Sequence, residues 1–160
     1  MRGLLIALLS AFLVGPAFGQ YVYGEAGVTM PRGSFAFAKT GFQGGVTGRL
    51  PVVRSDVDLS ATARVSYNVN PTPQGDIKRM TGVVGPEVSY TRGQLFTKAQ
   101  VGGGVSVAPW EEDQGTASMI RSRLAVGIET PSGSQLSIGP THAVTADNQW
   151  WWGISCAFSF

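Results

Sequence analysis

The stretch VDLSATARVSYNV, residues 57–69, decides the fold class, because apolar and polar side chains alternate along its whole length. Its odd-numbered residues are apolar from Val57 to Val69, and its even-numbered residues are polar or charged, including Asp58 and Arg64. Successive side chains of a β-strand point to opposite faces of the sheet, so the stretch predicts a strand with one apolar and one polar face. Its thirteen residues exceed the usual length of a globular strand, about 5–6 residues.

The same alternation recurs along the rest of the chain, and no segment after residue 20 shows the spacing of an amphipathic helix. Segments rich in glycine, proline, asparagine and aspartate separate the alternating stretches. An even number of strands joined by short connections favours an up-and-down antiparallel topology. The eight expected strands of this all-β chain are 20–30, 39–50, 57–69, 81–90, 95–107, 119–130, 135–144 and 150–160.

Composition narrows the class of protein. The chain has 160 residues, which fits one domain, and only 14% of them are charged against about 25% in an average soluble domain. The net charge of +2 is too small to indicate a nucleic-acid partner. A single cysteine, Cys156, excludes an internal disulfide framework and a cysteine-clustered metal site. We interpret Cys156 as a small apolar residue and expect no cofactor.

Residues 1–19 have the pattern of a cleaved signal peptide. Arg2 precedes the apolar run LLIALLSAFLV, and AFG at 17–19 places small residues at a cleavage site. The run is shorter than the roughly 20 residues of a membrane-spanning helix and is interrupted at Gly15 and Pro16. We therefore expect export, cleavage after Gly19, and a barrel formed by residues 20–160.

Two classes of protein fit eight alternating strands: an exported soluble barrel or sandwich with an apolar core, and an outer-membrane barrel with an apolar exterior. The charged residues favour the second, because all those in the expected strands take the face opposite the large apolar side chains. We predict that these six cations and four anions form an ion-pair network in a narrow lumen, where unpaired charges are costly. They are Glu25, Lys39, Arg49, Asp58, Arg64, Glu87, Lys98, Arg121, Arg123 and Glu129.

The apolar face also favours a membrane barrel. It is rich in small aliphatic residues, which suit a surface covered by lipid better than a core that must be filled at high density. Aromatic residues lie near the expected strand ends, where rings at headgroup level form girdles in transmembrane barrels. The predicted girdle residues are Tyr67, Tyr90, Trp150, Trp152, Phe158 and Phe160.

With the signal peptide and the closing alternation WGISCAFSF at residues 152–160, the sequence resembles the small OmpA/OmpX-like outer-membrane β-barrel proteins. The resemblance implies an eight-stranded antiparallel up-and-down transmembrane β-barrel in the bacterial outer membrane, with both termini in the periplasm. It further implies that the barrel-assembly machinery reads Phe160, and that outer-membrane lipid and lipopolysaccharide surround the protein. We expect a monomer.

The connections then alternate between the two sides of the membrane. We expect periplasmic turns at 51–56, 91–94 and 131–134, and outside loops near 31–38, 70–80, 108–118 and 145–149. Pro86 and Pro140 fall inside expected strands, where a closed barrel has no free edge to accommodate a residue without an N–H group. Bulges or different strand boundaries are expected at both prolines.

The favoured function is a structural or surface-interaction role, with a salt-bridged lumen that does not conduct ions. One alternative is a narrow, weakly anion-selective pore lined by Arg64, Arg121 and Arg123. Another is an enzyme that modifies lipid A or phospholipid, with His142 acting beside Ser137 or Asp147.

Two weaker candidate sites are His142 and the acidic run at residues 111–113. Lipid A deacylase barrels carry a serine two residues after the histidine, whereas Val144 stands there in this chain. We therefore interpret His142 as an interfacial residue and expect no enzyme. The acidic run Glu111, Glu112 and Asp113 could hold Ca²⁺ or Mg²⁺, but it lacks the ligand spacing of a calcium loop, and we favour a solvated loop without metal.

Overall fold

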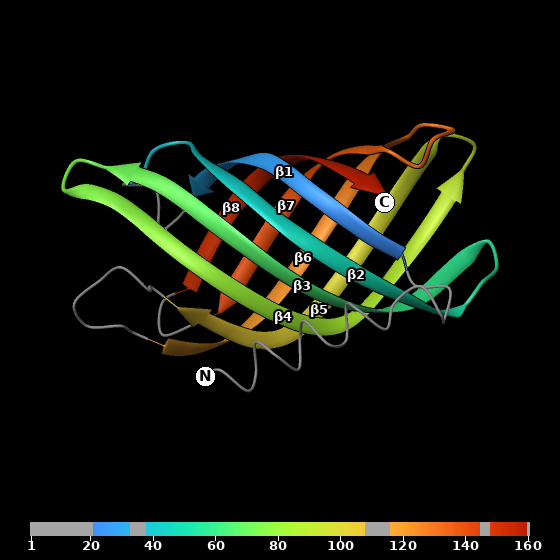
Figure 1. Ribbon diagram of the computed structural model, residues 1–160, viewed down its shortest axis with the longest axis horizontal. Coiled ribbons are helices and arrows are strands. Elements are labelled where there is room, and N and C mark those ends of the chain that lie inside the picture. Colours follow the sequence, from blue (N-terminus) through green and yellow to red (C-terminus); the bar gives the residue numbers. More distant parts are fainter. Residues whose placement is uncertain (1–20, 33–37, 108–115, 145–147, 160) are drawn as a thin grey trace.

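The structure is a computed structural model that describes residues 21–32, 38–107, 116–144 and 148–159. Eight antiparallel strands form a closed barrel in the order of the sequence (Figure 1), which confirms the predicted fold class. Across the described ranges, no helix is long and apolar enough to cross a membrane. The strands are β1 (Tyr21–Arg32), β2 (Gly41–Val53), β3 (Val57–Thr72), β4 (Gly75–Arg92), β5 (Leu95–Val107), β6 (Thr116–Glu129), β7 (Gln135–Val144) and β8 (Asn148–Ser159).

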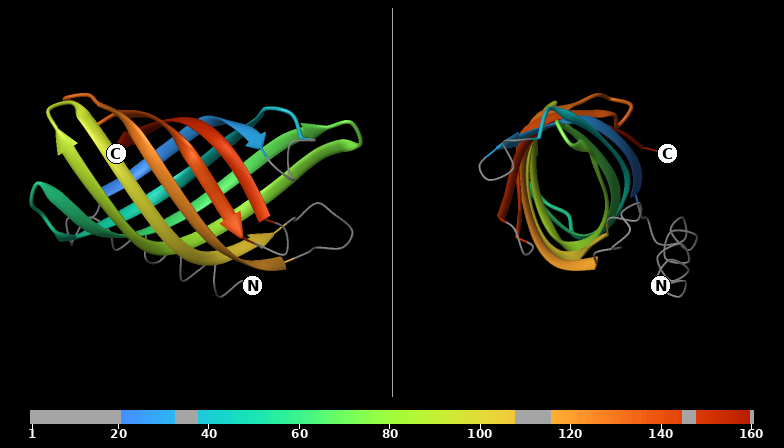
Figure 2. Two further views of the ribbon diagram at one scale, coloured as in Figure 1. Left: turned by 180° about the vertical axis from the view of Figure 1, so that it is seen from behind. Right: turned by 90° about the vertical axis from the view of Figure 1, so that its left-hand side faces the viewer.

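Pairing between β1 and β8 closes the barrel, and Figure 2 shows the resulting ring of strands from its end. Tyr23 lies opposite Ser159, so β1 begins and β8 ends at the same end of the barrel, which we call the terminal end. Connections 54–56, 93–94 and 130–134 lie at this end, and the turn at residues 73–74 lies at the opposite end, which we call the loop end. Gly93 has a positive φ of 63°, which a glycine adopts without strain in a tight turn.

The barrel is apolar outside and polar inside. Along β3, the inward-facing side chains of Ser60, Arg64 and Ser66 are 1%, 2% and 2% exposed. Outward-facing Phe42 and Leu95, by contrast, are 70% and 65% exposed. A water-soluble barrel would carry the opposite distribution, since burial of apolar surface is the main favourable term in folding.

The sequence misplaces one connection. Residues 70–80 are predicted as an outside loop, but β3 and β4 continue through this segment as a hairpin that turns at Pro73 and Gln74. Gly75 follows with a φ of 131°, a conformation that favours glycine. The longer β3 also places Tyr67 inside the strand, opposite Met80, and not at the strand end where the girdle was predicted.

Both prolines stay inside their strands, so neither an expected bulge nor an expected strand boundary lies there. The pairing register is the same on either side of Pro86 and Pro140, and only the bridges β4–β5 and β6–β7 are interrupted there. Glycine precedes each proline, and a side chain on Gly139 would collide with the carbonyl of Leu124 on the neighbouring strand. The register shifts instead between Pro51 and Val53, on the β2–β3 pair.

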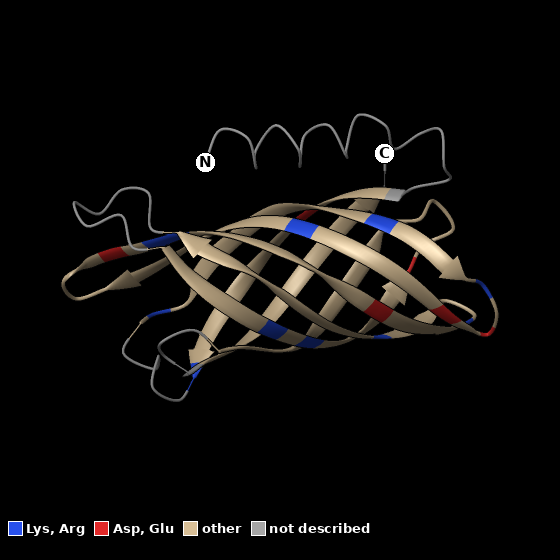
Figure 3. Ribbon diagram, turned by 90° about the horizontal axis from the view of Figure 1, so that it is seen from below, with Lys and Arg blue, Asp and Glu red and all other residues tan. Residues whose placement is uncertain are grey.

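The strand boundary also corrects the position of Lys39. The sequence places Lys39 on the inner face of a strand that starts at residue 39, but β2 begins at Gly41 and Lys39 is exposed. Its backbone N–H donates to the carbonyl of Pro71 at 2.7 Å. Lys39 therefore lies outside the lumen, and Figure 3 shows the remaining charged residues distributed along the strands and at both ends.

Candidate functional site

Glu25 on β1 is the centre of the charged interior. Arg64 on β3 approaches it with 2.7 Å between Nη2 and Oε2, and Arg123 on β6 reaches the same oxygen at 3.4 Å. The hydroxyl of Thr47 donates to the other carboxylate oxygen at 2.8 Å. One carboxylate thus serves two guanidinium groups from strands that are far apart in the sequence.

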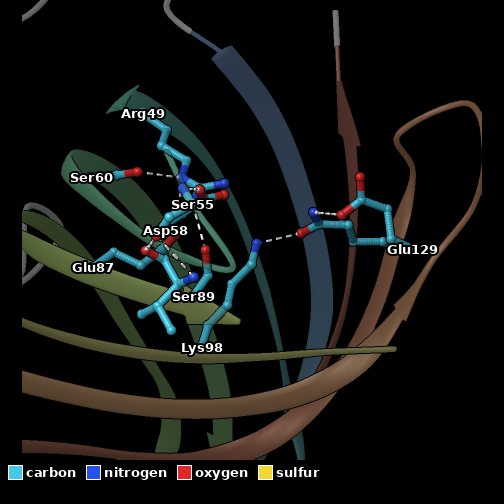
Figure 4. Close-up of polar contacts among 10 residues, drawn as sticks. Arg49, Ser55, Asp58, Ser60, Glu87, Ser89, Lys98 and Glu129 are labelled. Carbon is cyan, nitrogen blue, oxygen red and sulfur yellow. Dashed lines mark hydrogen bonds and ion pairs between the residues drawn. The ribbon is translucent and has the colours of Figure 1, made fainter. Parts of the chain in front are cut away.

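Arg49 on β2 forms a second cluster nearer the terminal end (Figure 4). Its guanidinium donates to the hydroxyls of Ser60 and Ser89 at 2.9 and 2.6 Å. The same group lies 3.4 Å from a Glu87 carboxylate oxygen and 3.9 Å from one of Asp58. Arg49 therefore links β2 to β3 and β4 across the interior.

Lys98 reaches an acidic residue through an amide. Its ammonium donates to Gln135 Oε1 at 2.5 Å, and Gln135 Nε2 donates to Glu129 Oε2 at 2.7 Å. The ammonium also lies 4.8 Å from the ring centre of Phe96, within the range of a cation–π contact. Figure 4 shows Lys98 pointing toward the Glu129 side of the barrel.

Arg121 differs from the other interior cations. It is 3% exposed, and no carboxylate of the described residues lies within ion-pair distance of it. Its guanidinium carbon lies 5.5 Å from the centre of the Trp151 ring. Its Nε has no hydrogen-bond partner among the described residues, and neither do Nε and Nη1 of Arg64, whose Nη2 lies against Glu25.

Arg64 and Arg121 form a layer across the interior, and one cavity of about 40 Å³ lies on each side of it. The terminal-end cavity is lined by charged residues such as Glu25, Arg49 and Lys98. The loop-end cavity is lined by hydroxyl and amide side chains, by Arg79 and by apolar residues that include Trp151. Arg64 and Arg121 line neither cavity. Each volume has room for only a few water molecules, given about 10–15 Å³ for one.

The outer wall carries the only histidine of the sequence. His142 stacks on Trp150 with ring centres 4.0 Å apart and planes 16° apart, so it faces outward as predicted. Ser137, on the same strand, faces inward and hydrogen-bonds to Ser155 at 3.0 Å, which excludes it as a partner of His142. Asp147 lies outside the described residues.

The structure places a different serine beside His142. Ser122 on β6 is paired with His142 in the register and faces the same way. Sequence reasoning missed this pair because the two residues lie on different strands, and only the register brings them together. The two-residue period showed which face Ser122 takes, but not its partner.

The remaining predicted site residues are placed as follows. Tyr90, Trp150, Trp152 and Phe158 lie on the outer wall and are 43%, 45%, 44% and 51% exposed. Phe160 and the acidic run 111–113 lie outside the described residues. Among those that are described, no three His, Cys, Asp or Glu side chains gather as a metal site would require.

Comparisons with known proteins agree on the fold. The outer membrane protein Ail of Yersinia pestis matches 88% of this chain and 99% of its own, with 11% identity and a TM-score of 0.50. The outer membrane enzyme PagL matches 86% of this chain and 98% of its own, with 12% identity and a TM-score of 0.53. The chain has the fold of a small outer-membrane barrel. No family model and no curated protein matches the sequence.

The likeness supports an outer-membrane β-barrel protein, and at this level of identity it extends to the fold alone. One of the two proteins is an enzyme by its description and the other is described only as an outer membrane protein.

Proposed function

We propose that the chain is an integral outer-membrane β-barrel protein with a structural or surface-interaction role. The observation that carries the proposal is the inverted distribution of side chains, with large apolar residues such as Phe42 exposed and ionised residues such as Arg64 buried. A surface of this kind is stable when lipid covers it and prone to aggregation in water. The proposal includes export by a signal peptide at residues 1–19 and a monomeric barrel.

The proposal also gives the barrel a direction in the membrane. The terminal end faces the periplasm and the loop end faces outward, in keeping with the generally shorter connections at the terminal end. Phe160 is proposed as the residue that the assembly machinery reads, and lipid and lipopolysaccharide as the surroundings.

We further propose that the lumen is a plug that does not conduct ions. The support is the layer formed by Arg64 and Arg121, which are 2% and 3% exposed and separate two small cavities. Side chains of an eight-stranded barrel are just able to fill its interior. An ion crossing this layer would have to displace a buried guanidinium from its carboxylate.

Two measurements test these proposals separately. Membrane fractionation together with heat-modifiable migration on gels tests the location and fold, and a protein that stays soluble without detergent would refute the membrane barrel. Recordings across planar bilayers test the plug, for which we expect no steady channel events. Conductance that is lost when Arg64, Arg121 and Arg123 are replaced would favour the anion-selective pore instead.

A lipid hydrolase is the second candidate function, and the pairing of Ser122 with His142 is the observation that favours it. A serine beside a histidine on the lipid-facing wall has the residue types of a nucleophile and its base. The test is release of fatty acid from lipid A or phospholipid by the folded protein. Activity that disappears in both Ser122→Ala and His142→Ala would establish this function, and absence of activity in the unmodified protein would exclude it.

A further inference from the structure

A polar row crosses four neighbouring strands on the outer wall, from Arg32 at the loop end of β1 to Ser122, midway along β6. Ser122 pairs with His142, His142 pairs with Trp150, and Trp150 pairs with Arg32, so the residues follow one another across β6, β7, β8 and β1. We call these four residues the polar row. Its span is about 14 Å, from an interstrand spacing of about 4.8 Å. Arg32 is exposed and supplies its cation.

An apolar groove begins immediately beside the polar row. On β6, β7 and β8, each residue of the row has an apolar neighbour on the same face, two positions nearer the terminal end. These neighbours are Leu124, Pro140 and Trp152. They line one side of a groove of about 470 Å³ that continues over Val126, Ile138 and Ala99. Polar and apolar surface thus adjoin as they do in a lipid, with a head group at one end and a hydrocarbon chain below.

The geometry points to a binding site for one lipopolysaccharide molecule on the outer wall. An acyl chain of its lipid A occupies the groove, and its phosphorylated sugars lie on the polar row, with Arg32 contacting a phosphate. Arginine is suited to this contact because its planar guanidinium binds phosphate through paired hydrogen bonds. This inference rests on the proposed function, which directs the loop end toward the outer leaflet.

Two features favour lipopolysaccharide over a phospholipid as the occupant. The polar row extends over four strands, which suits a disaccharide better than a single phosphate. It also contains the stacked rings of His142 and Trp150, and flat rings at a membrane interface provide an apolar face together with a polar edge. A glycerophospholipid would leave much of this row without contacts.

The test uses the folded full-length mature protein in detergent with purified deep-rough lipopolysaccharide, and phosphatidylglycerol as an anionic competitor. Native mass spectrometry measures the fraction of barrels that carry one lipid. We expect one bound lipopolysaccharide per barrel at concentrations where phosphatidylglycerol neither binds nor displaces it. Equal binding of the two lipids would overturn the inference.

Matched variants locate the site. Ala99→Phe fills the groove, and Ala61→Phe makes the same change on the exposed outer side of β3. Arg32→Gln removes the cation of the row, and Arg54→Gln removes an exposed cation at the terminal end, away from the groove. Losing one charge-assisted contact should weaken binding about threefold to tenfold in Arg32→Gln, and we expect a loss of similar size in Ala99→Phe.

The two control variants should bind as the unmodified protein does. Equal loss in Ala61→Phe and Ala99→Phe, or in Arg54→Gln and Arg32→Gln, would overturn the assignment to this groove. Heat-modifiable migration is measured on every sample, so a failure of the barrel fold is distinguished from a failure of binding. A folded barrel in the outer membrane that shows no lipid preference would leave the proposed function intact and refute this site.

Discussion

The two halves of the barrel interior are filled by different kinds of side chain. The terminal-end cavity is lined by both acidic and basic side chains, including Glu25, Glu87 and Arg49. The loop-end cavity has Arg79 as the charged residue of its lining and otherwise hydroxyls, amides and apolar groups. Trp151 packs there against the buried residues Val83 and Met119.

The difference matters because buried charge and buried neutral polarity respond differently to mutation. Removing one partner of a buried ion pair leaves an uncompensated charge, whereas removing a neutral hydroxyl leaves one unsatisfied hydrogen-bonding group. The terminal-end half should therefore contain the positions whose loss is most destabilising. Substitutions in the loop-end half should lower the free energy of unfolding less. Arg121 lies between the two halves, and its substitution should follow neither pattern.

The largest effect is expected for Glu25→Gln. This change keeps the shape of the side chain but removes the carboxylate shared by Arg64 and Arg123, leaving two like charges in a buried site. We expect the free energy of unfolding to fall by about 3–5 kcal/mol. Urea unfolding of the barrel in lipid vesicles, followed by tryptophan fluorescence, measures it.

Glu129→Gln is the matched control. Glu129 is half-buried and accepts a hydrogen bond from the neutral amide of Gln135. Its neutralisation should cost less than about 1 kcal/mol, in the range of a typical hydrogen bond. Equal losses in the two variants would show that the ion pairs do not distinguish the two positions.

The placement of Glu25 illustrates what the sequence could predict. A strand has an exact period of two, so parity alone assigns each charged residue to a face once the apolar face is known. The buried positions of Glu25 and Arg64 follow from that rule. Which cation meets which anion did not follow, because it depends on the register and on contacts across the lumen.

Turn-forming composition was a less reliable guide than parity. The segment NPTPQG at 70–75 has the residues of a loop, yet most of it forms the end of a hairpin. A closed barrel lets two long strands extend past their neighbours, since β3 and β4 need only each other as hydrogen-bonding partners there. The pairing of Ser122 with His142 was also missed, because composition does not show which residues lie opposite one another on neighbouring strands.

A smaller effect is expected for Thr81→Val in the loop-end half. The hydroxyls of Thr81 and Ser66 are 2.7 Å apart and both residues are buried, so valine leaves the Ser66 hydroxyl without this partner. We expect a loss of about 1 kcal/mol in the same unfolding assay. Thr97→Val changes an exposed residue of the outer wall and should cause no loss. A loss in Thr81→Val as large as that of Glu25→Gln would remove the distinction between the two halves.

The smallest effect is expected for Arg121→Met, although Arg121 is nearly as buried as Arg64. A buried cation stabilises a fold only when a partner offsets its desolvation, and the described residues supply Arg121 with the ring of Trp151 but no carboxylate within ion-pair distance. Methionine retains an unbranched stem that packs in irregular spaces. We therefore expect the free energy of unfolding to change by less than about 1 kcal/mol or to rise, since replacing a poorly compensated buried charge by an apolar side chain is often neutral or stabilising.

Arg64→Met, which takes one of two cations from Glu25, is the comparison, and it should be the more destabilising of the two. If Arg121→Met proved the more damaging, burial and not pairing would govern the contribution of these arginines, and the contrast between the two halves of the lumen would have to be explained by packing alone.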